Sequence, residues 1–144
     1  MSAKSKPEVL CDLGMECFKK GDTAKSIKFF EQALPLLEGD ATNSLLVTAL
    51  LNLGVSHMVA GDADKSAATL ERALAVQEAA LGEHSPELAG TLQNLTVVYS
   101  KLGRTEQAVG CMQRAGEIES RAAAQAKVAE LEAAAGPTVE EECR

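Results

Sequence analysis

Apolar residues recur along this chain at spacings of three and four, and short polar stretches containing glycine interrupt them at regular intervals. This pattern is typical of amphipathic helices joined by tight turns. Three of the interrupting glycines, Gly21, Gly61 and Gly103, are separated by 40 and 42 residues, a spacing found in helical repeats. The pattern therefore predicts three helical hairpins. They cover residues 7–38, 44–81 and 85–118.

The residues around these glycines also match from one hairpin to the next. Matching positions in the first helix hold Leu13, Leu53 and Leu95, then Gly14, Gly54 and Thr96, then Cys17, His57 and Tyr99, and those in the second helix hold Phe30, Leu70 and Met112, then Ala33, Ala73 and Ala115. Small and large residues at helical spacing on both sides of a turn predict two antiparallel helices in close contact. One such hairpin cannot bury its apolar face alone, so the hairpins are expected to stack as an all-α solenoid.

Capping residues indicate where two of the hairpins begin. Ser5 is followed three residues later by Glu8, which is a capping-box pattern, so residues 1–6 are expected to form a flexible N-terminus. A polar turn precedes the third hairpin, and its last residues predict Ser85 as the N-cap and Pro86 as the first helical residue.

The last hairpin is followed by an alanine-rich stretch, residues 119–135, that has high helix propensity and a thin apolar stripe. One long helix can continue through it. Alternatively, a break near Ser120 frees a final helix that covers the exposed end of the stack, as terminal repeats require. We expect such a capping helix, followed by a disordered tail over residues 136–144.

Composition adds limits on partners. The chain has 144 residues, which suits a single domain, and a formal net charge of −7, which argues against nucleic acid as a partner. The longest apolar stretch, from Leu45 to Ala60, contains polar residues and is too short to cross a bilayer. No apolar segment typical of a secretory signal follows the N-terminal lysines. We therefore expect a cytoplasmic protein with no nucleic-acid or membrane partner.

The cysteines and histidines show no catalytic or metal-binding pattern. The four cysteines lack the close pairing of metal ligands and fit no disulfide framework. His57 falls at a position expected to be buried, and His84 lies in a turn without a nucleophile or phosphate-binding motif. We expect no catalysis, no cofactor and no metal.

The matching positions resemble the tetratricopeptide repeat (TPR) family over about residues 7–118. The resemblance rests on Leu13-Gly14 with Cys17, Leu53-Gly54 with His57, Leu95-Thr96 with Tyr99, the turn glycines and the matching alanines. The repeat length and the stretch Leu81-Gly82-Glu83-His84-Ser85-Pro86, followed by Thr91-Leu92-Gln93-Asn94-Leu95, are similar to the kinesin light chain subclass. The resemblance implies a right-handed superhelix in which the first helices of the hairpins line a concave groove.

Helical periodicity then assigns residues to this groove. The candidates are Cys11, Met15, Lys19, Leu51, Asn52, Val55, Val59, Gln93, Asn94, Val97 and Lys101. Asn52 and Asn94 occupy equivalent sites, and an asparagine amide can donate to and accept from the backbone of an extended peptide. Kinesin light chains, which this chain resembles, use such asparagines for cargo peptides. The alternative is that each asparagine hydrogen-bonds the adjacent hairpin and fixes the stacking.

The expected function is therefore that of a non-catalytic adaptor that binds a peptide or an amphipathic helix. The acidic tails of chaperones are not expected to bind, because the clamp of Lys, Asn, Asn, Lys and Arg that TPR proteins use for these tails is absent here. The corresponding residues here are Cys11, Met15, Asn52, Gly90 and Asn94. The alternative function is a homo-oligomeric or assembly subunit whose groove is filled by its own C-terminal helix or by a second copy.

Overall fold

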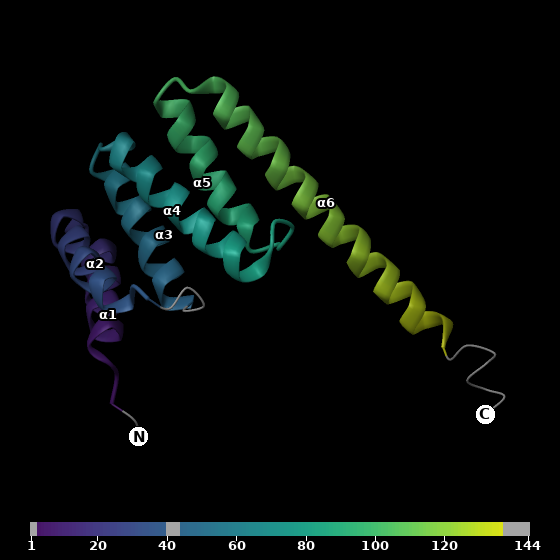
Figure 1. Cartoon of the computed structure of the whole chain (residues 1–144), viewed down its shortest axis with the longest axis horizontal. Coiled ribbons are helices and arrows are strands. Elements are labelled where there is room, and N and C mark those ends of the chain that lie inside the picture. The colour runs from purple at the N-terminus through teal and green to yellow at the C-terminus, as the bar shows by residue number, and fades with distance from the viewer. Residues whose placement is uncertain (1–2, 40–43, 137–144) are drawn as a thin grey trace.

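The computed structural model describes residues 3–39 and 44–136, and within these ranges the chain is all-α. The helices are α1 (Lys6–Lys19), α2 (Thr23–Leu37), α3 (Ser44–Val59), α4 (Ala63–Leu81), α5 (Leu88–Lys101) and α6 (Thr105–Ala135). Each odd-numbered helix pairs with the helix that follows it, and the three hairpins stack in chain order (Figure 1). The predicted all-α solenoid of three hairpins is confirmed.

Glycine allows the sharp turn inside each hairpin. Gly21, Gly61 and Gly103 have backbone φ angles of 84°, 88° and 72°, a region that other residues rarely adopt. The aspartates that follow the first two glycines cap the next helix: Asp22 accepts a hydrogen bond from the Lys25 backbone N–H, and Asp62 accepts one from the Lys65 N–H. These turns set the two helices of a hairpin antiparallel.

Within each of the first two hairpins, glycine also sets the distance between the two helices. A Cβ atom added at Gly14 would lie 2.9 Å from Cζ of Phe30, and one added at Gly54 would lie 2.7 Å from Cγ of Leu70. Both large side chains are 0% exposed. Each first helix therefore rests on the large apolar residue of its partner helix.

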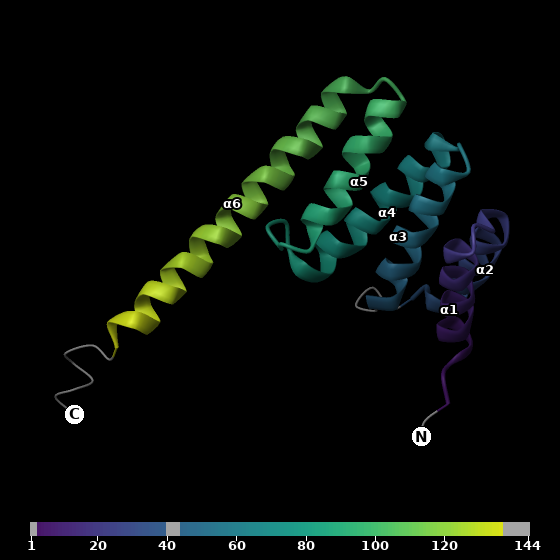
Figure 2. The same cartoon turned by 180° about the vertical axis from the view of Figure 1, so that it is seen from behind.

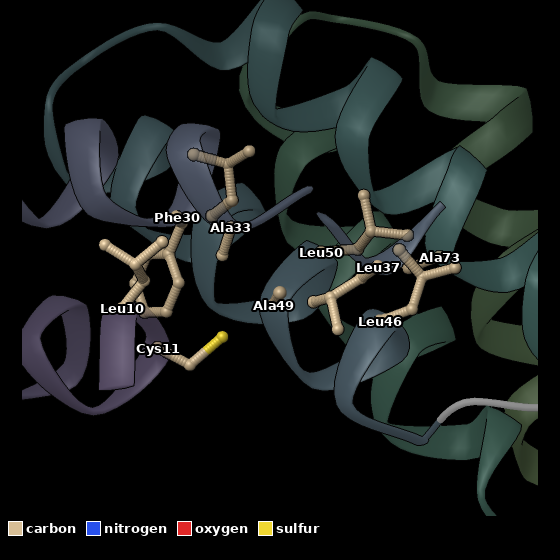
Figure 3. Packing of buried hydrophobic residues seen from close by; sticks show 10 residues of the cluster. Leu10, Cys11, Phe30, Ala33, Leu37, Leu46, Ala49, Leu50 and Ala73 are labelled. Atoms are coloured by element: carbon tan, nitrogen blue, oxygen red, sulfur yellow. The ribbon is translucent and has the colours of Figure 1, made fainter. Parts of the chain in front are cut away.

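The apolar core runs between successive hairpins. Its first cluster joins α1, α2, α3 and one residue of α4, and contains Leu10, Cys11, Phe30, Ala33, Leu37, Leu46, Ala49, Leu50, Leu53 and Ala73 (Figure 3). Cys11 is only 2% exposed, and burial raises the pKa of its thiol. The expectation that Cys11 lines the groove is therefore wrong, because its side chain packs into the cluster that α1, α2 and α3 share.

The third hairpin begins later than the capping pattern predicts. The segment from Ser85 to Glu87 is a turn, and α5 starts at Leu88, whose N–H donates to the Ser85 carbonyl. Ser85 thus shapes the turn, but it does not cap the helix.

The last helix is unbroken from Thr105 to Ala135, so the break expected near Ser120 does not occur. No glycine or proline interrupts residues 117–135, and alanine strongly favours the helix. Among the described helices, the backbone of α6 packs along that of α5 alone, and the residues of α6 from 123 onward are all exposed and extend past the stack (Figure 2). The C-terminal helix is thus an extension of the last hairpin that neither folds over the stack nor enters the groove.

Two further expectations fall wholly or partly on undescribed parts of the chain, the tail almost entirely and the N-terminus in its first two residues. Only Gly136 of the predicted disordered tail belongs to the described residues, and residues 1–2 of the predicted flexible N-terminus lie outside them.

Candidate functional site

The stack curves toward its first helices. The backbone of α3 closely approaches those of α1 and α5, whereas over the described residues the backbones of α2, α4 and α6 do not approach one another and only side chains bridge them. The first helices are therefore closer together than the second helices. The surface that α1, α3 and α5 form on this side is the concave groove.

A small hollow opens in the groove between the first two hairpins. Its volume is about 80 Å³, and its lining residues are Met15, Phe18, Lys19, Phe30, Asn52 and Val55. Four of these residues, Met15, Lys19, Asn52 and Val55, were predicted from helical periodicity. This α1–α3 hollow combines apolar walls with one amide and one ammonium group.

Helical spacing explains which side chains meet at the α1–α3 hollow. Met15 and Phe18 are three residues apart on α1, and Asn52 and Val55 are three apart on α3, so each pair shares one helix face. Phe30 reaches the hollow from α2 because Gly14 leaves room for its ring. The prediction missed Phe18, although its spacing from Met15 pointed to the same face, and it placed Phe30 only in the core.

Asn52 and Asn94 are half-buried in the groove at equivalent positions of α3 and α5. Neither side-chain amide forms a hydrogen bond with any of the described residues, so each has a donor and an acceptor available. The first hairpin has Asp12 at this position, and its carboxylate accepts a hydrogen bond from Lys4 Nζ. Among the described groove residues, the two amides are therefore half-buried polar groups that lack an internal partner and carry no charge.

Apolar side chains surround the two amides. Leu51 is half-buried and packs against the first core cluster and against a second cluster, which consists of Ala67, Leu70, Leu95, Val98, Tyr99 and Ala108. Val59 and Val97 are 59% and 46% exposed. Together with Met15 and Val55, these residues give the groove an apolar surface of the kind that a partner's side chains can cover.

The remaining predicted residues lie toward the edges of the groove. Gln93 points toward α6, where its Nε2 donates to Glu119 Oε1 over 2.8 Å. Lys19 and Lys101 lie in the last turns of α1 and α5, are exposed, and form no ion pair with the described residues. The groove edge at these helix ends is therefore positively charged.

The structure offers little for other chemistry. No group of three His, Cys, Asp or Glu residues that could hold a metal occurs in the described part of the chain. His57 is buried, and this burial lowers the pKa of its imidazole. A charged hollow of about 430 Å³ lies beside α6, where Arg114 Nη1 already bonds Glu78 Oε1 over 2.7 Å. Among the described helices, none has the length and hydropathy needed to cross a membrane.

Comparison with known families and proteins identifies the repeats of this chain and a group of similar sequences. Models described as tetratricopeptide repeat match residues 7–36 and 45–118. A protein named "Photosystem I assembly protein Ycf3" from Prochlorococcus marinus (strain MIT 9303) is 29% identical over 110 residues, which are 76% of this chain and 57% of that protein. The chain thus spans little more than half the length of this relative.

Solved structures with similar folds include kinesin light chain-like proteins. BtubC (BKLC) from P. vanneervenii superposes with a TM-score of 0.72 at 24% identity, over 80% of this chain and 47% of that one. A putative kinesin light chain from Podospora anserina, with nearly identical TPR-like repeats, gives a TM-score of 0.70 at 16% identity, over 85% and 59% of the two chains. The repeat models cover more than half of the sequence, and the chain belongs to the tetratricopeptide repeat family.

Proposed function

We propose that this protein is a non-catalytic interaction module that binds an extended peptide segment of another protein in its concave groove. The observation that carries the proposal is the pair Asn52 and Asn94, two half-buried amides at equivalent positions without internal hydrogen bonds. A half-buried polar group without a partner favours a ligand that supplies one. The backbone of an extended peptide offers a donor and an acceptor at every residue.

The apolar surroundings of the amides supply the second part of the binding energy. The α1–α3 hollow next to Asn52 has room for one small aliphatic side chain, and Val97 beside Asn94 is exposed. Side chains that alternate along an extended peptide would enter the hollow and cover these residues. Lys19 and Lys101 at the groove edge favour a ligand with acidic residues beside its apolar ones.

A binding experiment tests this proposal. Peptides selected from a random library on the wild-type protein would be titrated against the Asn52→Ala/Asn94→Ala variant, and the affinity is expected to fall about tenfold to hundredfold, because each lost hydrogen bond is worth about 1 kcal/mol. Gln32→Ala, an exposed amide on α2, is the matched control and should bind like the wild type. Equal affinity of all three proteins would contradict the proposal.

The same experiment separates binding from stacking. If the asparagines fixed the hairpins to one another, the double variant would unfold at a lower urea concentration than the wild type. The proposal requires an unchanged midpoint together with a lost affinity.

An assembly role is the second candidate. It is supported by the relatives named "Photosystem I assembly protein Ycf3", which align with 76% of this chain. In such a role the groove would hold a segment of a protein subunit until the subunit joins its complex. Partners recovered on the wild type and lost on the Asn52→Ala/Asn94→Ala variant should then be subunits outside their finished complex.

A further inference from the structure

The two ends of the stack expose apolar residues whose equivalents inside the stack are buried. On α1, Val9 and Leu13 are 41% and 37% exposed, whereas Ala49 and Leu53, their equivalents on α3, are 0% and 4% exposed. On α6, Met112 is 57% exposed, and its equivalent on α4 is fully buried. Each end is thus one half of the contact that joins successive hairpins.

We propose that these two ends bind each other, so that α1 of one copy packs on α6 of a second copy, head to tail. Two surfaces take part. The outer face of α1 consists of Lys6, Val9, Leu13 and Glu16, and the outer face of α6 consists of Val109, Met112, Gly116 and Glu119. The contact uses the ends of the stack and leaves the concave groove open, so it is independent of peptide binding.

The contacts between hairpins inside the chain supply the geometry. Between α2 and α3, Ser26 Oγ lies 3.2 Å from Ser56 Oγ, and between α4 and α5, Thr91 Oγ1 donates to Gln77 Oε1 over 2.6 Å. Each pair can be moved to the equivalent repeat positions of α6 in one copy and α1 in the second copy. Ser26 and Ser56 then correspond to Ala108 and Glu16 of the second copy, and Gln77 and Thr91 correspond to Glu119 and Val9 of the second copy. These two antiparallel pairs place Leu13 opposite Met112.

Two features of α6 leave its outer face open to a second helix. Thr96 occupies the position that glycine has in the first two hairpins, and Met112, with no further hairpin packed on it, stays on the surface. Gly116 lies in open space, with no atom within 4 Å of an added Cβ. A glycine inside a helix destabilises it by about 0.5–1 kcal/mol, but it allows another backbone to approach closely.

The same register also brings opposite charges of the two copies toward each other. Lys6 lies one turn before Val9, and the register brings its ammonium group toward the Glu119 carboxylate of the other copy. The corresponding residues of the other hairpins, Leu46 and Leu88, are 4% and 0% exposed. Because the charged Lys6 stands where the other hairpins have a buried leucine, the contact between copies is weaker than the contacts within the chain. Association is therefore reversible, and head-to-tail contacts that do not close give open chains of copies.

Two variants test the proposal by sedimentation velocity over a concentration series. The wild-type mass should rise with concentration above the 15.1 kDa of one chain. Leu13→Glu and Met112→Glu should each remain at the mass of one chain. Their equimolar mixture should form a dimer and nothing larger, because each variant keeps the end that the other has lost. Both side chains are exposed, so circular dichroism should show unchanged helicity.

A third variant is the matched control. Leu131→Glu changes a more exposed leucine, on the part of α6 that extends past the stack, and it should associate like the wild type. A wild-type protein that stays at one-chain mass throughout, or a mixture of the two variants that stays monomeric, would overturn the proposal. Association that survives in Leu13→Glu would also overturn it, because the α6 faces would then be pairing with each other.

Discussion

The first two hairpins and the third differ in how their helices meet. In the first two, Gly14 and Gly54 allow a large apolar residue of the second helix to lie beneath the first helix, fully buried. In the third, Thr96 stands at the glycine position, its Oγ1 donates to the Leu92 carbonyl, and Met112 is 57% exposed. The large residue thus belongs to the core where a glycine faces it and another hairpin covers it, and to the surface where neither condition holds.

The largest expected effect comes from shortening the large residue in both kinds of hairpin. Leu70→Ala should lower the free energy of unfolding by about 2–5 kcal/mol, because it leaves a cavity beneath Gly54. Met112→Ala removes an exposed side chain and should change the free energy of unfolding by about 0.5 kcal/mol or less. Urea denaturation of dilute protein measures both values, and similar losses in the two variants would mean that the hairpins pack alike.

A smaller effect is expected from the glycines themselves. Gly54→Ala places a methyl group 2.7 Å from Leu70 Cγ, and the resulting overpacking should cost about 1–3 kcal/mol. Gly110→Ala is the matched control, because this glycine of α6 has open space around it and alanine should stabilise the helix by about 0.5–1 kcal/mol. A lower unfolding temperature for Gly54→Ala together with a higher one for Gly110→Ala would support the account. Shifts of both unfolding temperatures in the same direction would contradict it.

The smallest effect is a pH dependence specific to the second hairpin. His57 is buried where the third hairpin has Tyr99, and burial lowers the pKa of its imidazole. Because the unfolded chain takes up the proton first, the free energy of unfolding should fall as the pH drops below about 6.5. The expected slope is shallower in His57→Gln, measured by urea denaturation at about pH 7.5 and about pH 5.5. Parallel curves for the two proteins would exclude this contribution.

The sequence predicted the repeating parts of the fold well, because they depend on local chemistry. The turn glycines, the capping box at Ser5 and the small residue at Gly14 act within one hairpin, and the structure has them as expected. The groove position of Cys11 and the helix break near Ser120 were predicted wrongly for a different reason. Whether a groove position is covered, or a long helix folds back, depends on contacts between hairpins that periodicity does not encode.

The candidate site could be predicted only in part for the same reason. The spacing on α1 and α3 identified Met15, Asn52 and Val55, which the structure brings together at the α1–α3 hollow. Phe30 lies on the opposite helix of its hairpin, and its access to the hollow depends on the glycine above it. Gln93 faces α6 because Glu119 offers it an acceptor there.

The most direct measurement of the central claim is a side-chain amide NMR spectrum recorded during titration with a selected peptide. The account predicts that the amide signals of Asn52 and Asn94 both shift as the peptide binds, because both form new hydrogen bonds, while the amide signal of Gln32 on α2 stays in place. Shifts confined to α2, α4 or α6, with both asparagine signals unchanged, would contradict the claim that the groove amides hold the ligand.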